Sequence, residues 1–160
     1  GNRIPQLIQC LDQIHGNKVI GADGRGAEQS TVDEVQKQID PLDKQGLGEG
    51  LANIGCVFTA KAATEKSIAV NVSVALAKEK SMQVAKTEIE EKLIAYFKDL
   101  ALDNKSDTAI VRLTSIGNIL LNCDSIIDYS NLTLDDGSSN VTISVNSVPI
   151  LGTLTVSAME

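Results

Sequence analysis

The sequence has almost no aromatic residues. Among its 160 residues there is no tryptophan, and phenylalanine and tyrosine together make up only 2%. Hydrophobic residues still account for 42%, so the core must be built from aliphatic side chains. This composition offers few of the Tyr, Trp and Arg side chains that dominate small recognition sites. A chain of this length can form one ordinary domain or two small lobes, with about two-thirds of its unfolded surface buried.

Cysteine and histidine are also scarce. The three cysteines, Cys10, Cys56 and Cys123, are far apart and form no CxxC pair. This spacing argues against a disulfide framework or a zinc site and predicts free thiols in a reducing cytoplasm. The single histidine, His15, has no partner nearby in the sequence for acid–base work. We therefore expect no metal and no cofactor.

Long apolar runs and excess positive charge are missing as well. No run of about 18 apolar residues is present, which predicts no membrane span. The first residues lack the charged-then-apolar plan of a signal peptide. The formal net charge of −7 argues against nucleic-acid binding, which requires Lys and Arg to displace counterions from phosphates. Lys86 and Lys92 alternate with Glu88, Glu90 and Glu91, a pattern typical of a solvated helix face.

The first third of the chain predicts a small βα unit. Apolar spacing favours a helix from Arg3 to Ile14, followed by a brief strand at Val19 and Ile20 and a tight turn over residues 21–26. Thr31 and Glu34 form a capping-box pattern for a second helix, which Pro41 ends. The glycine-punctuated stretch 42–51 is predicted to be a plain connector, because it fits neither GxGxxG nor GxxxxGK.

The remaining residues predict strands around two helices. The clearest strand runs from Ile68 to Leu76, where large aliphatic residues strictly alternate with small or polar ones. Helices are predicted from Ser81 to about Asp99 and from Asp107 onward, the second with an apolar face containing Ile110, Leu113, Ile116 and Leu120. Further strands are expected at 56–60, 127–134, 141–145 and 153–156, with turns at 64–66 and 135–137 and a kink at Val148–Pro149.

This order predicts an α+β fold, with helices packed on one face of a mostly antiparallel sheet and a small βα unit before it. We predict two parts: residues 1–55 as a βα lobe with a glycine-rich connector, and residues 56–160 as an α+β lobe of two strands, two helices and three strands.

No residue pattern favours catalysis. His15 is predicted to be a surface residue at a helix end, and Cys123 to be buried in packing. Two aspartate pairs, Asp124 with Asp128 and Asp135 with Asp136, lack the regular oxygen-ligand spacing of a cation loop and are predicted to be helix-end and turn residues.

Several segments resemble the C-terminal part of the baseplate J-like proteins. The resemblance is carried by Asp128–Leu134 (DYSNLTL) and Val148–Thr155 (VPILGTLT), together with Asp40–Pro41, the glycines 46–50, Ile54–Gly55, the strand 68–76 and the segment 88–93. That family belongs to contractile-tailed bacteriophages and includes the XkdT-type proteins of defective prophages.

The resemblance implies a structural protein rather than an enzyme. Its expected place is the tail baseplate of a virion made in the bacterial host cytoplasm, in contact with other wedge and hub proteins and with copies of itself. We expect interfaces on the edge strand near Thr153 and Thr155 and on the predicted helix carrying Asp107 and Arg112. Two alternatives are a small enzyme domain using Cys123 or His15, and a non-phage binding or adhesion module.

Overall fold

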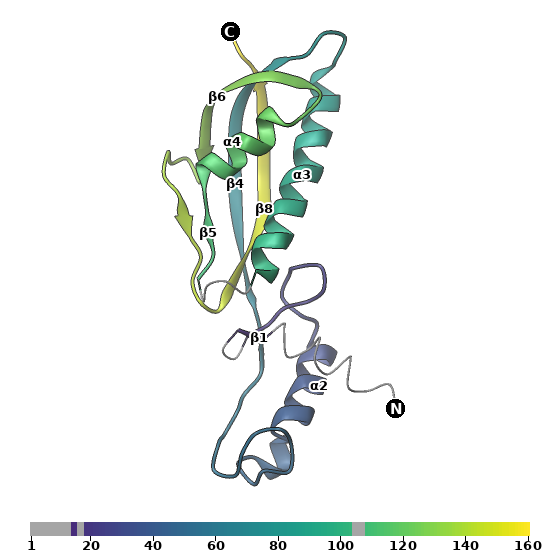
Figure 1. Cartoon of the computed structure of the whole chain (residues 1–160), viewed down its shortest axis with the longest axis vertical. Helices are drawn as coiled ribbons and strands as arrows, with labels where there is room; N and C mark the ends of the chain where they lie inside the picture. The colour runs from purple at the N-terminus through teal and green to yellow at the C-terminus, as the bar shows by residue number, and fades with distance from the viewer. Residues whose placement is uncertain (1–13, 16–17, 104–107) are drawn as a thin grey trace.

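The computed structural model describes residues 14–15, 18–103 and 108–160. The molecule is elongated, with one module at each end of its long axis (Figure 1). We call residues 14–15 and 18–63 the α2 module and the rest the sheet module. The helix predicted over Arg3–Ile14 falls mainly outside the described residues, and Ile14 and His15 themselves form a strand.

The α2 module contains short strands and one amphipathic helix. Strands β1 (Ile14–His15), β2 (Lys18–Val19) and β3 (Lys61–Ala62) form a sheet in the order β1-β2-β3. The helix α2 (Gln29–Ile39) and the short helix η1 (Leu42–Lys44) lie between β2 and β3 in the sequence. Its small core contains Val19, Ala27, Val32 and Val35. The predicted strand at Val19, the turn at 21–26 and the helix end before Pro41 are confirmed.

Two predictions in this module are wrong. Helix α2 begins at Gln29 behind the N-cap residue Glu28, so Thr31 lies inside the first turn and caps nothing. Residues 56–60 form no strand. The carbonyl of Phe58 and the N–H of Ala60 bond to glutamine side chains, so they have no strand partner.

The sheet module is built on the strand β4 (Thr64–Leu76), which lies between two others. The order is β6-β4-β8, with β6 spanning Ile126–Leu134 and β8 spanning Ser147–Ala158. β4 pairs antiparallel with β6 and parallel with β8. The α+β class is confirmed, and three of the five described ladders are antiparallel, although the longest, β4–β8, is parallel.

The two helices α3 (Met82–Leu102) and α4 (Leu113–Leu121) cover one face of this sheet. Every second residue of β4 from Ile68 to Val74 is at most 3% exposed and packs against them. The alternation of large aliphatic residues with small or polar ones therefore determines which face of β4 is buried, as predicted. The Ser81 side chain caps α3 by accepting the N–H of Val84 at 3.3 Å, also as predicted.

Four predictions for the sheet module differ from the structure. Thr64–Lys66 is part of β4 and not a turn. Ile110 lies in β5 (Ile110–Val111), so the predicted helix begins only at Leu113 behind Arg112, and Asp107 lies outside the described residues. Strand β7 (Val141–Thr142) pairs with β5 and ends before Val145. β8 runs through Pro149 without interruption, because an edge strand tolerates a residue that lacks an N–H.

Close backbone packing joins α4 to β6. A Cβ atom at Gly117 of α4 would overlap the hydroxyl oxygen of Tyr129 on β6. The absence of a side chain at Gly117 thus lets the helix lie directly over the strand.

The two modules meet through both polar and apolar contacts. The Arg25 guanidinium forms two hydrogen bonds to the Glu65 carboxylate, at 3.0 and 2.8 Å. Lys18 Nζ donates to the carbonyl of Ser147 at 3.1 Å. Val148 is buried in a shared cluster with Ile20, Ala63 and Ala101. The predicted division at residues 55 and 56 remains a prediction, which limited proteolysis can test.

Candidate interface surfaces

Strand β8 is an uncharged edge of the main sheet. It pairs only with β4 in the described three-stranded sheet, and residues 147–158 include no Asp, Glu, Lys or Arg. Long edge strands of soluble proteins usually carry charges, bulges or prolines that discourage pairing with another chain. In β8 the register shift opposite Ile68–Val70 and the single Pro149 serve this purpose, so the half around Thr155 is the less protected one.

The sheet face opposite the helices is polar and has small side chains. Asn71 of β4 aligns with Thr133 on one side and Thr155 on the other. Ser73 and Ser157 join their hydroxyls at 3.0 Å. Thr153 and Thr155 are both exposed, so two of the predicted interface residues lie on accessible positions of β8.

The other predicted interface residues lie elsewhere. Arg112 is exposed and occupies the N-cap position of α4, and its N–H donates to the Tyr96 hydroxyl at 3.4 Å. Helix α4 packs over β6, the strand at the opposite edge from β8. Arg112 and the threonines of β8 therefore belong to separate surfaces. Asp107 lies outside the described residues.

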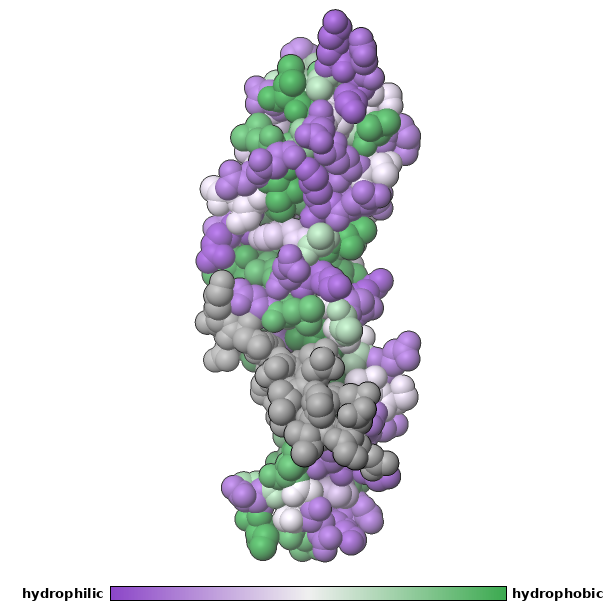
Figure 2. All heavy atoms as spheres, turned by 45° about the vertical axis from the view of Figure 1, so that its right-hand side comes forward, coloured by the Kyte–Doolittle hydropathy of each residue, from purple (hydrophilic) through white to green (hydrophobic). Residues whose placement is uncertain are grey.

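A surface that sequence reasoning missed lies on the loop between α2 and β3. Residues 42–57, which we call the aliphatic loop, expose five large aliphatic side chains: Leu42 (69%), Leu47 (62%), Leu51 (54%), Ile54 (82%) and Val57 (69%). Single exposed aliphatic residues are common on proteins, but a contiguous group often marks an interaction site. Figure 2 shows hydrophobic atoms on the surface at the same end of the molecule. The glycines of this segment predicted only a connector, and the aliphatic residues between them gave no sign of a surface.

The aliphatic loop is held in a defined conformation by the end of α2. The N–H groups of Leu51 and Ala52 donate to the carbonyls of Gln38 and Ile39, at 3.1 and 2.8 Å. These are acceptors that a helix leaves free in its last turn. A Cβ atom at Gly50 would overlap the Ile39 carbonyl oxygen, so this contact requires a glycine.

Two buried polar side chains secure the same loop and residues 58–60, which follow it. The Asp40 carboxylate accepts the N–H groups of Gly46 and Phe58, both at 2.9 Å. Gln36 accepts the N–H of Ala60 at 2.7 Å and donates to the carbonyls of Asp40 and Phe58. Asp40 is 1% exposed and Gln36 is 5% exposed, so these bonds are shielded from water. The loop thus has a fixed shape although its aliphatic side chains face solvent.

A second apolar surface lies between α3 and β8. This α3–β8 groove has a volume of about 190 Å³ and is bordered by the turn at residues 23–25. Its apolar lining comes from Ile94, Phe97, Pro149, Ile150 and Leu151, and charged residues line it as well, among them Glu90 and Lys98. Ile94 is 52% exposed although its neighbour Leu93 is fully buried.

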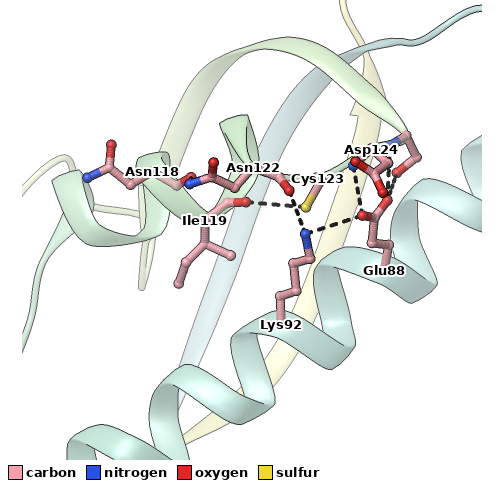
Figure 3. Close-up of polar contacts among 8 residues, drawn as sticks. Glu88, Lys92, Asn118, Ile119, Asn122, Cys123 and Asp124 are labelled. Carbon is pink, nitrogen blue, oxygen red and sulfur yellow. Dashed lines mark hydrogen bonds and ion pairs between the residues drawn. The ribbon is translucent and has the colours of Figure 1, made fainter.

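A polar cluster joins α3 to the start of β6 (Figure 3). The Glu88 carboxylate accepts the N–H groups of Asp124 and Ser125, at 2.8 and 3.0 Å, and the Ser125 hydroxyl. Lys92 contacts Glu88 at 3.3 Å and donates to the Asn122 carbonyl at 2.6 Å. Glu88 was predicted to lie on a solvated face. That prediction is wrong for Glu88, because its side chain is only 21% exposed and bonds to Asp124 and Ser125, which lie 36 and 37 positions away in the sequence.

Electrostatics in this cluster favour a charged Glu88. Desolvation raises the pKa of Glu88, but the hydrogen bonds from Ser125, Asp124 and Lys92 outweigh it and bring the pKa to about 2.

The thiol of Cys123 stays protonated, because burial raises its pKa. Its Sγ donates to the Ile119 carbonyl at 3.3 Å, which confirms the prediction of a buried packing residue.

The remaining residues considered for chemistry are not brought together. His15 lies in β1 of the α2 module, whereas Cys123 lies in the core of the sheet module. Asp135 and Asp136 form the predicted turn after β6, where they bond to Ala69 and Asn71 of β4. Within the described ranges there is no group of three or more His, Cys, Asp or Glu side chains that could hold a metal ion. No helix in the same ranges has both the length and the apolar character to cross a membrane.

Comparison with known families accounts for the sheet module. Residues 68–157, from the middle of β4 to the end of β8, match the model of the baseplate J-like protein C-terminal domain. The chain belongs to the baseplate J-like family. The match spans β4, α3, β5, α4, β6, β7 and nearly all of β8, so the module described above is the family's C-terminal domain.

Two curated relatives come from Bacillus subtilis strain 168. The phage-like element PBSX protein XkdT is 35% identical over 121 residues, which cover 76% of this chain and 33% of the relative. The uncharacterized protein YqbT is 29% identical over 138 residues, which cover 86% of this chain and 38% of that relative. The chain thus spans between 33% and 38% of the length of these two relatives.

Proposed function

We propose that this chain is a structural part of a phage or prophage tail baseplate, where it acts through protein–protein contacts and not as an enzyme. The observation that carries the proposal is the family match over residues 68–157, together with the likeness to a protein of a phage-like element. The proposed location is the baseplate of the virion tail, after synthesis in the cytoplasm of the bacterial host.

The finer role proposed is that of a wedge component, in contact with other wedge and hub proteins and with copies of itself. Two surfaces are available for such contacts: the uncharged edge of β8 with Thr153 and Thr155, and the N-terminal end of α4 with Arg112. An edge strand offers unpaired backbone groups to a strand of a neighbour, and an exposed arginine offers a charged hydrogen-bond donor. The two surfaces lie at opposite edges of the sheet, so they can serve two different neighbours.

Charge changes on these surfaces test the wedge role. Thr155→Lys on β8 and Arg112→Glu on α4 are expected to reduce incorporation of the protein into a reconstituted baseplate, because a charge at a strand edge and a reversed charge both disfavour close contact. A matched control is Glu91→Lys on the exposed face of α3. Unchanged incorporation of both test variants would remove these surfaces from the proposal.

The non-enzymatic role has its own test. A double variant with His15→Ala and Cys123→Ala is expected to support assembly of infectious or tail-like particles at the wild-type level, after correction for any loss of stability at the buried Cys123. Particles that assemble fully but fail at a later chemical step would favour the enzyme alternative.

A further inference from the structure

We propose that an extended segment of another baseplate protein adds to β8 as a fourth strand of the main sheet, antiparallel to β8 and along residues 154–158. This contact names the kind of partner that the β8 edge takes, and it rests on the proposed baseplate role. Antiparallel pairing is the more stable form of strand pairing per residue. Three features of the molecule support the contact: the direction of the backbone groups of β8, the side chains beside them, and the position of α3.

The backbone groups of β8 point alternately towards β4 and away from it. The N–H of Met159, directly after β8, donates to the Val74 carbonyl of β4 at 2.9 Å. The pairing of β4 with residues 154–158 has no register shift, so this alternation continues back along the strand. The groups of Ser157 and Thr155 therefore also point towards β4. Three residues point away from it: Leu154, Val156 and Ala158.

These three outward residues form a template for another strand. Among the described residues, none of their N–H groups has an acceptor and none of their carbonyls has a donor. Such a row of unpaired groups pairs readily with an extended chain, and residues 147–158 carry no charge that would oppose it.

Pro149 limits the template at its other end. The Asn146 carbonyl accepts the N–H of Thr64 of β4 at 2.9 Å, so Asn146 points towards β4 and Pro149, three positions later, points away. A proline has no N–H to offer to a further strand. The added segment therefore begins after Pro149, and β8 itself shows that an outward position tolerates proline.

The side chains of this half of β8 set the chemistry of the added segment. Thr155 and Ser157 are exposed on the open face, where Ser157 already joins its hydroxyl to that of Ser73 at 3.0 Å. On the face covered by the helices, Leu154 is buried and Val156 is half-buried. Cross-strand pairs of hydroxyl side chains and of branched aliphatic side chains both stabilise a sheet. The matching segment alternates Thr or Ser with aliphatic residues over about five positions.

Charged side chains do not select this partner. The α3–β8 groove, beside residues 149–152, is lined by two acidic and two basic residues: Asp23, Glu90, Arg25 and Lys98. The two signs balance, so this end of the edge gives no preference for a charged segment. Recognition by the backbone groups and by the uncharged side chains beside them remains.

The position of α3 favours a different protein over a second copy. The backbone of α3 lies closer to β8 than to β4. Neighbouring strands are about 4.8 Å apart, whereas packed helices need about 8–10 Å between their axes. If a second copy added its β8 antiparallel to this β8, its own α3 would lie on the same face and overlap the first. A second copy that added its β6 antiparallel would meet the same obstacle, because α4 packs on β6. An extended segment without a helix on it has no such conflict.

Hydrogen exchange resolved to single amides tests the direction of the groups and their partner. In the isolated chain, the amides of Leu154, Val156 and Ala158 should exchange faster than those of Thr155 and Ser157, which bond within the sheet. In a reconstituted baseplate, the three outward amides should exchange at least about tenfold more slowly than in the isolated chain. Unchanged exchange of all three in the assembled particle would overturn the added strand.

Proline variants test the same contact by incorporation into the baseplate. Val156→Pro removes one outward N–H but no bond to β4, so it should leave the sheet folded and reduce incorporation about tenfold at limiting concentration. Val156→Ala, which keeps the N–H, is the matched control and should incorporate like the wild type. Thr155→Pro removes an N–H that points towards β4 and should instead lower the thermal unfolding temperature. Equal incorporation of Val156→Pro and Val156→Ala would contradict the proposal.

Crosslinking identifies the partner. A photoreactive amino acid in place of Thr155, in the assembled baseplate, should crosslink to a segment of another protein in which Thr or Ser alternates with aliphatic residues, as read by mass spectrometry. A crosslink to a copy of this chain would overturn the choice of partner. So would dimers of the isolated chain in sedimentation velocity up to about 1 mM that are lost in Val156→Pro.

The baseplate role and this contact fail in different ways. A wild-type chain that incorporates normally, with unprotected outward amides, would leave the baseplate role intact while the added strand fails. A wild-type chain that does not incorporate would remove the baseplate role and this contact with it.

Discussion

The Glu88 carboxylate on α3 accepts both the backbone N–H and the hydroxyl of Ser125, the residue immediately before β6. One side chain of a long helix thereby fixes the point at which the chain enters the sheet. Ser125 is 1% exposed, so its polar groups need these bonds.

The charge of Glu88 makes stability depend on acidity. The pKa of Glu88 falls from 4.5 in its ordinary state to about 2 in the folded protein, so its contribution is complete above about pH 4.5 and is lost as the pH falls towards 2. Glu88→Gln should lower the free energy of unfolding at pH 7 by about 1–3 kcal/mol. The difference from the wild type should shrink in acid, as measured by urea unfolding from pH 7 to pH 2. Glu91→Gln, on the exposed face of the same helix, serves as the control, and an equal loss there would contradict the assignment.

Packing between α4 and β6 should be sensitive to one methyl group. Gly117→Ala places a Cβ atom against the Tyr129 hydroxyl and should destabilise the protein by about 1–3 kcal/mol. Combining it with Tyr129→Phe removes the overlapping oxygen and should restore part of the loss. Thermal unfolding of both single variants and the double variant measures the coupling between the two sites. Strictly additive effects would mean that the two residues do not meet.

The buried glutamine of α2 should control the order of residues 58–60, which follow the aliphatic loop. Gln36→Leu leaves the Ala60 N–H without its acceptor and should cost about 1–3 kcal/mol. Hydrogen exchange at Ala60 should become faster in the variant, because the bond that protects this amide is gone. In Gln38→Leu the lost bond is the solvent-exposed one to Glu34, so exchange at Ala60 should not change. Faster exchange in both variants would point to general destabilisation of α2.

Neighbouring residues of α3 should differ sharply in their effect on stability. Leu93 is fully buried, and Leu93→Ala should cost about 2–5 kcal/mol through lost packing and a residual cavity. Ile94 is 52% exposed, so Ile94→Ala should change the free energy of unfolding by no more than about 0.5 kcal/mol. Chemical denaturation of both variants tests which face of α3 meets the sheet. A large loss of stability in Ile94→Ala would mean that this side of α3 is also packed in the core.

Much of the fold follows from local patterns in the sequence. The alternation from Ile68 to Val74 predicted the buried face of β4, and Ser81 correctly marked the start of α3. Asp135 and Asp136 predicted a turn, and both adopt the left-handed backbone conformation that aspartate tolerates. In each case the information lies within a few neighbouring residues.

The errors arise where distant residues decide the structure. Ile110 fits the helical spacing of Leu113 and Ile116, but its backbone pairs with Thr142 in a strand. Thr31 and Glu34 have the pattern of a capping box, yet the chain becomes helical two residues before Thr31. The parallel pairing of β4 with β8 leaves no local signature, because neither strand contains the information about its neighbour. The aliphatic loop was not predicted, because its order depends on the Asp40 carboxylate and on the last carbonyls of α2, which leave no pattern in the sequence.

The parallel pairing of β4 with β8 also governs when the sheet can form. Ser73 and Ser157 meet although they are 84 positions apart, and the two helices α3 and α4 and the three strands β5, β6 and β7 lie between β4 and β8 in the sequence. Strands that are far apart in the sequence pair slowly, because the entropy cost of closing the long intervening loop precedes the favourable contacts between them. On the ribosome, β4 would emerge long before β8 and present an unpaired apolar edge for several seconds of synthesis. Nascent chains of this protein are therefore expected to depend on chaperones until β8 pairs with β4.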